Sequence, residues 1–351
     1  MSHIISGPVP VFPRKRTPIH PVFLPGMGCP RTCIYCDQAL QTGVSSRPLP
    51  DIYHHLSVFL QRARAENRPP FELAFFGGTF TALPRKWQIQ FVDLVQGYKA
   101  SGMITALRCS TRPDACDPQH LLHLQNRGLD LIELGAQSFD PWVLRASGRG
   151  YTPECIHRAC RDIRESGLSL GIQLLPGLPR HTIPLWLKDI RHTCALKPAF
   201  VRIYPCLVLA GTPLHNLWTQ GRFQPWSLDM TVTALARALL RLWRADIPII
   251  RMGLHPEPGL VRSIQAGPWH PALGTLVRSR VLMALISAMS RHLPPGPKVL
   301  TCPGSVQGEL WGYKGSYRLR LHSLGISSKR IVYHQHPRID LCLATSDCPL
   351  C

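Results

Sequence analysis

The sequence predicts an α/β fold, a partial (βα)6 barrel of the TIM type with a small C-terminal extension. Short apolar segments alternate with stretches of helical periodicity, as parallel strands joined by crossover helices do. The six predicted strands lie at 19–24, 71–76, 104–109, 129–138, 168–175 and 199–204. Because a closed barrel of this type needs eight such units, we expect the sheet to stay open on one side.

We expect the 351 residues to divide into three segments. Residues 1–17 are proline-rich and include Arg14, Lys15 and Arg16, so we expect a basic arm. Residues 18–290 hold the predicted barrel and an extension of it. Residues 291–351 form a small cysteine-containing segment, with strand patterns expected at 316–322 and 331–334.

Three cysteines, Cys29, Cys33 and Cys36, follow the first predicted strand. Thiolates suit iron-sulfur clusters, and a 4Fe-4S cube normally takes one thiolate for each iron. Three thiolates would leave one iron with an open coordination position. The alternatives are a zinc site or three unrelated thiols, although no fourth Cys or His lies nearby to close a tetrahedral zinc site. The loop follows a strand end, which is where α/β barrels build active sites.

The second predicted strand ends in Gly77, Gly78 and Thr79. Glycines at a strand end let the backbone approach a ligand closely because no Cβ intervenes. On its own, such a pair is more often a structural turn. The interpretation as a ligand site therefore depends on the three cysteines that precede it.

Polar residues also follow the third and fourth predicted strands. Arg112 is suited to bind a carboxylate. Glu133 and Gln137 would meet ribose or amino-acid hydroxyls if they point inward, and Arg149 follows in the next loop. The alternative is a network at the barrel mouth whose members satisfy one another.

Taken in order, seven motifs resemble the radical S-adenosylmethionine (SAM) superfamily. Within it they are most similar to the radical SAM half of the catalytic third subunit of Elongator and its bacterial relatives, and more distantly to oxygen-independent coproporphyrinogen oxidases. The motifs are CPRTCIYC, FFGGTF, STRPD, IELGAQS, SGRGY, LLPGLP and VRIYPCLVLAGTPL. The resemblance covers roughly residues 18–290 and implies a radical SAM barrel.

The resemblance also implies cofactors and site residues. Cys29, Cys33 and Cys36 would hold a 4Fe-4S cluster. The residues expected to contact SAM are Gly77, Gly78, Thr79, Arg112, Gln137 and Arg149. A donor such as a flavodoxin or ferredoxin would reduce the cluster. About 60 residues follow the resemblance, too few for an acetyltransferase domain of ordinary size, so no acetyltransferase activity is expected.

The implied function is reductive cleavage of SAM and radical modification of a substrate, with a tRNA base as the first candidate. One alternative is a radical SAM enzyme that acts on a small molecule or a peptide. Another is a cluster-bearing RNA-binding protein without SAM chemistry.

Charge bears on the choice of partner. Lys and Arg number 40 against 20 Asp and Glu, a net charge of +20, which favours tRNA or another RNA as partner. The alternative is a general richness in arginine, since the charges are spread along the chain.

We find no uncharged apolar run of about 18 residues and no signal peptide, and we expect a cytoplasmic protein without a membrane partner.

The last segment contains four cysteines, with His334 and His336 as further ligands. The cysteines are Cys302, Cys342, Cys348 and Cys351. Four thiols suffice for zinc or a second cluster, and so short a segment needs such a metal site to stabilise its fold. The alternative is a set of incidental thiols near the terminus.

Overall fold

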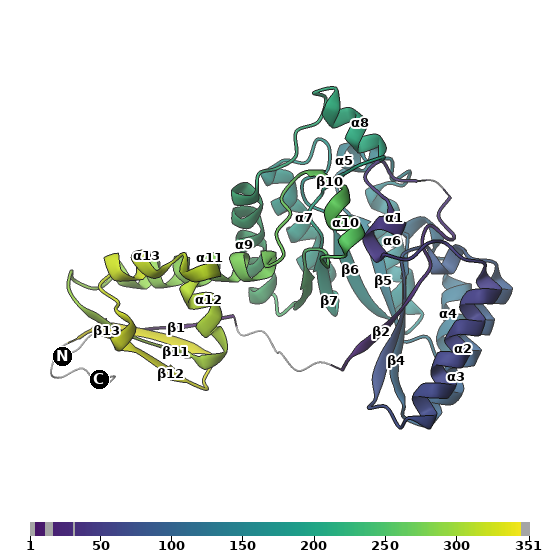
Figure 1. Cartoon of the computed structure of the whole chain (residues 1–351), viewed down its shortest axis with the longest axis horizontal. Coiled ribbons are helices and arrows are strands. Elements are labelled where there is room, and N and C mark those ends of the chain that lie inside the picture. The colour runs from purple at the N-terminus through teal and green to yellow at the C-terminus, as the bar shows by residue number, and fades with distance from the viewer. Residues whose placement is uncertain (1–3, 11–16, 31, 345–351) are drawn as a thin grey trace. The chain divides into compact units, whose positions relative to one another are not determined.

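The structure is a computed structural model of the whole chain, and it describes residues 4–10, 17–30 and 32–344 (Figure 1). These residues form two compact units. The larger unit is drawn from Lys15–Thr231 and Ile247–Pro271, and the smaller one from Met1–Arg14, Val232–Asp246 and Ala272–Cys351. Each unit is described by itself.

The larger unit is built on a curled half-barrel of seven parallel strands. In sheet order they are β2 (Ile19–Phe23), β3 (Phe71–Phe76), β4 (Ile104–Thr111), β5 (Leu131–Gln137), β6 (Ser169–Leu174), β7 (Phe200–Ile203) and β9 (Ile249–Met252). The order in the sheet follows the order in the chain, as in a βα barrel that does not close. The six predicted strands are confirmed, and β9 is a seventh that the sequence analysis missed.

Helices connect these strands, and their apolar spacing explains how they pack. The long ones are α2 (Leu49–Ala65), α3 (Arg85–Ala100), α4 (Pro118–Asn126), α6 (Pro153–Glu165) and α7 (Ile183–Leu196). In α2 the buried residues Ile52, Leu56, Leu60 and Ala63 recur every three or four positions, so they form one stripe along the helix. Two of these helices begin with a side-chain cap: Asp117 of α4 accepts a hydrogen bond from His120 N, and Thr182 of α7 accepts one from Leu185 N.

Short elements surround the carboxyl ends of the strands. The helices are α1 (Gln38–Thr42), α5 (Pro141–Ala146), α8 (Pro213–Thr219) and α10 (Pro258–Ser263). The strands β8 (Val208–Leu209) and β10 (Ile264–Ala266) pair antiparallel and form a separate ribbon. Helix α9 (Leu228–Arg244) leads from the larger unit into a segment of the smaller one.

The described part of the smaller unit contains a four-stranded sheet, most of α9 and three further helices. The sheet order is β1 (Ile5–Pro8), β13 (Arg338–Leu343), β11 (Lys298–Pro303) and β12 (Ile331–His334). The helices are α11 (Leu273–Ser290), α12 (Gln307–Trp311) and α13 (Arg318–Ser323). Leu282 and Ile286 of α11 share a core with Leu300 of β11 and Leu341 of β13.

This unit differs from the sequence expectations in three ways. The strand expected over 316–322 is wrong, because that stretch contains helix α13. Leu319 is 85% exposed whereas Leu321 is buried, so these two leucines do not lie on the same face, as they would in a strand. Residues 331–334 do form a strand, β12. Part of the expected basic arm is the edge strand β1, and the unit includes stretches within 232–290 that were expected to belong to the barrel segment.

Helix α11 is the one helix in the described ranges that is long and apolar enough to cross a membrane, with a mean hydropathy of 1.3. Half of it is buried inside the protein. Arg278 Nε donates to Glu309 at 3.0 Å and Arg280 Nε donates to Tyr317 at 3.2 Å, so both arginines on this helix have partners within the unit. These contacts are those of a core helix.

Candidate cluster and cofactor site

The larger unit contains a cavity of about 1080 Å³. Its lining includes a residue at or next to the carboxyl end of every strand of the half-barrel: Phe23, Phe76, Thr111, Gln137, Gln173, Arg202 and Arg251. All the residues that the resemblance assigns to the cluster and to SAM line it as well: Cys29, Cys33, Cys36, Gly77, Gly78, Thr79, Arg112, Gln137 and Arg149. The fold thus brings together segments more than 100 residues apart in the chain.

The cysteine loop is attached to the end of β3 through backbone hydrogen bonds. Gly26 N donates to Gly77 O at 2.9 Å, and Thr79 N donates to Met27 O at 2.8 Å. A Cβ on Gly78 would lie 2.5 Å from the carbonyl oxygens of Leu24 and Met27, so this position requires glycine. Gly78 therefore lets the loop that carries the cysteines approach the strand closely.

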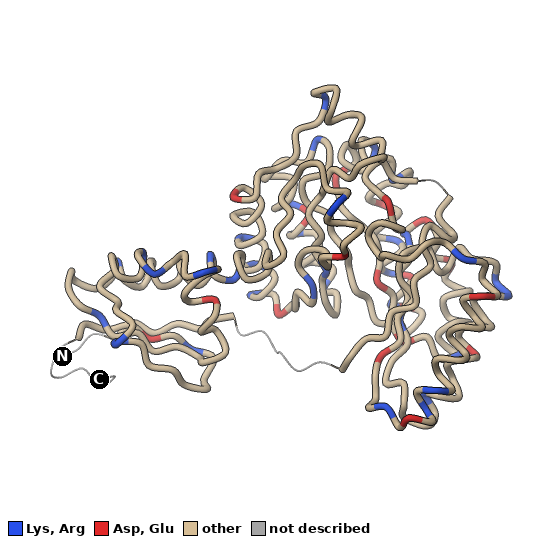
Figure 2. The backbone as a smooth tube through the Cα atoms, viewed as in Figure 1, with Lys and Arg blue, Asp and Glu red and all other residues tan. Residues whose placement is uncertain are grey.

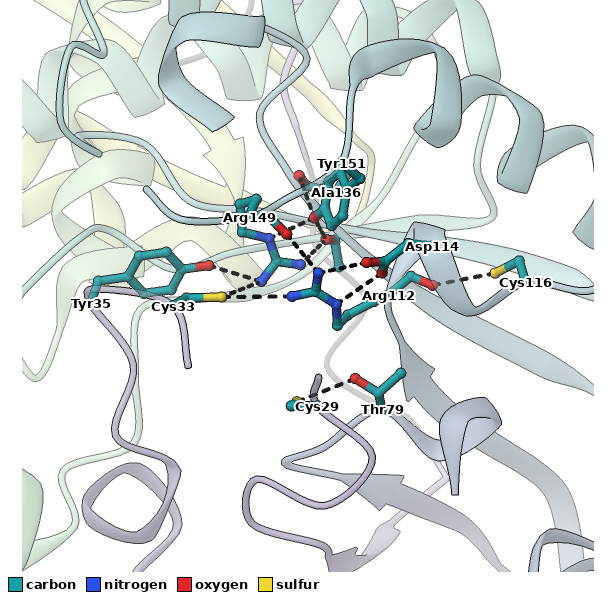
Figure 3. A network of polar contacts seen from close by, with 11 residues as sticks. Cys29, Cys33, Tyr35, Thr79, Arg112, Asp114, Cys116, Ala136, Arg149 and Tyr151 are labelled. Carbon is teal, nitrogen blue, oxygen red and sulfur yellow. Dashed lines mark hydrogen bonds and ion pairs between the residues drawn. The ribbon is translucent and has the colours of Figure 1, made fainter. Parts of the chain in front are cut away.

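Two buried arginines reach the sulfur of Cys33 (Figure 3). Arg149 Nη1 lies 3.2 Å from this sulfur and also donates to Tyr35 Oη at 3.1 Å. Arg112 Nη1 lies 3.8 Å from the same sulfur. Both guanidinium groups, which carry a permanent positive charge, thus present N–H donors to the Cys33 sulfur.

Further contacts hold both arginines in place. Asp114 accepts two hydrogen bonds from Arg112, at 2.9 and 2.7 Å. Tyr151 Oη accepts one from Arg149 Nε at 2.6 Å and donates to Gly135 O at 2.6 Å. Burial raises the pKa of Tyr151 to about 12, which keeps its hydroxyl protonated. The orientation of both guanidinium groups is therefore fixed before any ligand binds.

The other two cysteines of the loop, Cys29 and Cys36, line the same cavity. Cys29 Sγ lies 3.3 Å from Thr79 Oγ1, next to the glycine pair. Burial, and then the neighbouring Cys33 and Cys29, raise the pKa of Cys36 to about 12, so a bound cation is needed to hold it as a thiolate. In the described part of the chain no three metal-ligating side chains lie close enough to bind one ion. A cluster does not require this, since each thiolate binds its own iron.

Gln137 and Glu133 have different surroundings. Gln137 lines the cavity with a φ of +68°, a left-handed conformation that is costly for a residue other than glycine and is common at functional sites. Glu133 is fully buried and accepts hydrogen bonds from Arg202 Nη2 at 3.0 Å, Gln173 Nε2 at 3.0 Å and Arg108 Nη1 at 3.3 Å. Glu133 thus belongs to a buried polar network with Arg108, Gln173 and Arg202.

The sequence analysis missed Gln173 and Arg202 as residues of this cavity. Each is a polar residue between two apolar neighbours in its strand, β6 or β7. A polar side chain in a buried strand costs free energy unless it has a partner, and this signal could have identified both.

The predicted tail site is not assembled in the sheet of the smaller unit. Cys302 belongs to the core that includes α11, whereas Cys342, which is disulfide-bonded, packs with Val299 in a separate cluster. Val299 pairs with Cys342 and lies three residues from Cys302, so the two cysteines point to opposite faces of the sheet. They cannot bind the same ion in this arrangement. Cys348 and Cys351 lie outside the described residues.

Comparison with protein families gives two matches. The model of the radical SAM superfamily matches residues 23–190, and that of the radical SAM C-terminal domain matches residues 198–282. Together they span the half-barrel from the end of β2 onward. Residues after 282 lie outside both models.

Curated relatives share this region. The tRNA uridine(34) acetyltransferase of Methanocaldococcus infernus is 28% identical over 267 residues, which are 63% of this chain and 50% of that protein. Elongator complex protein 3 of Homo sapiens is 28% identical over 221 residues, 55% of this chain and 40% of that protein. The chain therefore spans half or less of the length of these relatives.

A solved structure shows the same fold. The archaeal Methanocaldococcus infernus Elp3 with residues 1–46 deleted superimposes with a TM-score of 0.58 at 22% identity, over 77% of this chain and 64% of that one. At this identity the likeness concerns the fold alone. With two adjacent family models matched across the half-barrel and the three-cysteine loop at its cavity, this chain belongs to the radical SAM superfamily of enzymes and has a radical SAM region homologous to that of Elongator complex protein 3.

Proposed function

We propose that the chain binds a 4Fe-4S cluster through Cys29, Cys33 and Cys36 and modifies a tRNA base by radical chemistry. The observation that carries this proposal is the shared cavity, which brings the cysteine loop and the segment Gly77–Thr79 together at the open end of the half-barrel. When bound, a reduced cluster of this superfamily supplies the electron that cleaves SAM and generates a radical able to abstract hydrogen.

The chain's own residues would prepare this site in three ways. The three thiolates would hold three irons and leave one for a ligand. Arg149 and Arg112 would donate hydrogen bonds to the Cys33 sulfur at the cluster. The close contact at Gly78 would keep the cysteine loop against β3, so that the cluster and the Thr79 side chain face the same space.

Three observations support tRNA as the substrate. The curated relatives include proteins named for tRNA uridine 34. The net charge of +20 favours a polyanionic partner. The cavity, at about 1080 Å³, is at the upper end of the range usual for small-molecule sites and leaves room for a substrate group beside a cofactor. The matched region is the radical SAM part of these relatives, so the proposal covers radical chemistry only.

The test is an anaerobic assay of reconstituted, dithionite-reduced protein with SAM and total tRNA. We expect release of 5'-deoxyadenosine and a modified nucleoside, detected by mass spectrometry of digested tRNA, and neither product from the variant Cys29→Ala/Cys33→Ala/Cys36→Ala. Release of 5'-deoxyadenosine without any change in tRNA would favour a small-molecule or peptide substrate. No 5'-deoxyadenosine from a fully loaded cluster would favour an RNA-binding protein without SAM chemistry.

A further inference from the structure

Positive charge is concentrated in the smaller unit. Its described residues, 4–10, 232–246 and 272–344, contain 13 Lys and Arg against three Asp and Glu. The described residues of the larger unit contain 23 against 16, although they are more than twice as many. In Figure 2 the smaller unit shows many blue segments and few red ones. The general arginine richness of the chain does not explain this difference.

Within that unit, residues 310–339 contain no acidic residue, and we call them the basic segment. The segment includes α13, β12 and the connections around them. Six of its residues are exposed Lys or Arg side chains: Lys314, Arg318, Arg320, Lys329, Arg330 and Arg338. Among the residues that the structure describes, none of the six forms an ion pair.

Other basic residues of the same unit have structural partners. Arg278 is paired with Glu309, and Arg280 donates to Tyr317 and to Thr233. Lys298 is buried, and its Nζ donates to the carbonyl oxygens of Gly296 and Leu324. The six exposed side chains of the basic segment have no acidic partner among the described residues, so no carboxylate there offsets their positive charge. A bound polyanion would supply the negative charge that these side chains lack.

Using the tRNA substrate of the proposed function, we infer that the basic segment binds the phosphate backbone of tRNA. Four of the six residues are arginines, and the planar guanidinium group of an arginine can donate two parallel hydrogen bonds to one phosphate group. Aromatic rings lie among them: Lys314 Nζ is 5.6 Å from the ring centre of Tyr313, and Tyr333 on β12 is 37% exposed. Basic side chains interleaved with rings on which bases can stack are typical of RNA-binding surfaces.

An anionic membrane fits this surface less well. Helices that lie on membranes present a continuous apolar face beside a basic one. Helix α13 has only six residues, and its exposed apolar residue Leu319 stands alone between Arg318 and Arg320. The basic segment also lies beyond residue 282, outside both radical SAM family models, so this surface is a property of this chain rather than of the matched region.

The test compares two full-length variants with the same change in charge. The first is Arg318→Gln/Arg320→Gln/Lys329→Gln/Arg330→Gln in the basic segment. The matched control is Arg62→Gln/Arg64→Gln/Arg85→Gln/Lys86→Gln, four exposed basic residues on α2 and α3 of the larger unit. Binding of fluorescent bulk tRNA is measured by anisotropy between 50 and 300 mM salt. In parallel, binding to vesicles of phosphatidylserine and phosphatidylcholine is measured by sedimentation.

We expect the first variant to bind tRNA at least tenfold more weakly at 100 mM salt. The slope of log binding constant against log salt concentration should become less steep by about 3, because each phosphate that the variant no longer neutralises accounts for roughly 0.7 to 0.9. The control should change the slope by less than about 1. Iron content and 5'-deoxyadenosine release should equal those of the wild type, which shows that the variant folds. As a charge-preserving check, Arg318→Lys/Arg320→Lys/Arg330→Lys should keep most of the wild-type slope.

Equal effects of the first variant and the control would overturn the inference and leave the proposed function intact. So would loss of vesicle binding in the first variant with tRNA binding unchanged, which would indicate a membrane surface. A wild-type protein that releases 5'-deoxyadenosine but does not bind tRNA would refute the proposed substrate and, with it, this use of the basic segment.

Discussion

The Nη1 atom of Arg149 lies 3.2 Å from the sulfur of Cys33, closer than Arg112, which reaches the same sulfur at 3.8 Å. Hydrogen bonds to cluster sulfurs tune the reduction potential. A reduced cluster carries one more negative charge than an oxidised one, so a cationic donor beside its ligand favours the reduced state. The two arginines should therefore raise the potential by different amounts.

The first prediction is that Arg149→Leu lowers the reduction potential of the cluster, and that Arg112→Leu lowers it less. Redox titration followed by electron paramagnetic resonance measures both values. Arg145→Gln is the control, because this exposed arginine contacts Trp142 rather than Cys33. An unchanged potential in Arg149→Leu, with the iron content of the wild type, would contradict the assignment of Arg149 as a donor to the cluster.

The second prediction concerns a fourth cysteine at the same cavity, Cys206, which is buried and follows β7. If only Cys29, Cys33 and Cys36 bind iron, Cys206→Ala should keep about four irons and four sulfides per chain. Alanine at any one of the three loop cysteines should lose most of both. Iron and sulfide analysis after anaerobic reconstitution tests this. Loss of iron in Cys206→Ala to the same extent would make Cys206 a ligand and leave no open iron.

The half-barrel and its site were predictable because the signals are local. Each predicted strand is a short apolar run, and the carboxyl ends of parallel strands meet at one edge of a sheet. This rule alone places Cys29, Gly77 and Gln137 near one another, and the structure agrees. Strand β9 was missed because it has four half-buried residues and follows Pro248.

The smaller unit was not predictable in the same way because its contacts are long-range. Its edge strand comes from residues 5–8 and pairs with residues 338–341. The positions of Cys302 and Cys342 depend on the register of β11 against β13, and a four-cysteine pattern in the sequence does not contain that register. The buried arginine pair at Cys33 likewise depends on the turns that follow β4 and β5.

The third prediction concerns the close contact between the cysteine loop and β3. In Gly78→Ala the added methyl group would overlap the carbonyl oxygens of Leu24 and Met27, and overpacking of this kind costs about 1–3 kcal/mol. We expect a lower Tm and partial loss of iron. The control is Gly97→Ala in α3, where nothing lies within 4 Å of the new Cβ and alanine should stabilise the helix by about 1 kcal/mol. Equal Tm values and full iron in both variants would show that the loop tolerates a side chain there.

The last prediction concerns pH. His20 on β2 stacks on Phe59 of α2, with ring centres 3.7 Å apart and planes 8° apart. Burial, and then the nearby Arg68, lower the pKa of His20 below its usual 6.5. Below pH 6.5 the unfolded chain therefore binds a proton that the folded protein resists, so stability falls as the pH falls through this range.

His20→Phe keeps an aromatic ring on Phe59 and removes the titrating group. The fall in Tm between pH 7.5 and pH 5.5 should therefore be smaller in this variant than in the wild type, when both are loaded with cluster and scanned anaerobically. His54→Phe is the matched control for the exchange of histidine for phenylalanine, because His54 is an exposed residue of α2. Acid lability of the cluster is common to all three proteins and cancels in the comparison. If the wild type and His20→Phe lose the same number of degrees, then protonation of His20 does not contribute to the loss of stability in acid.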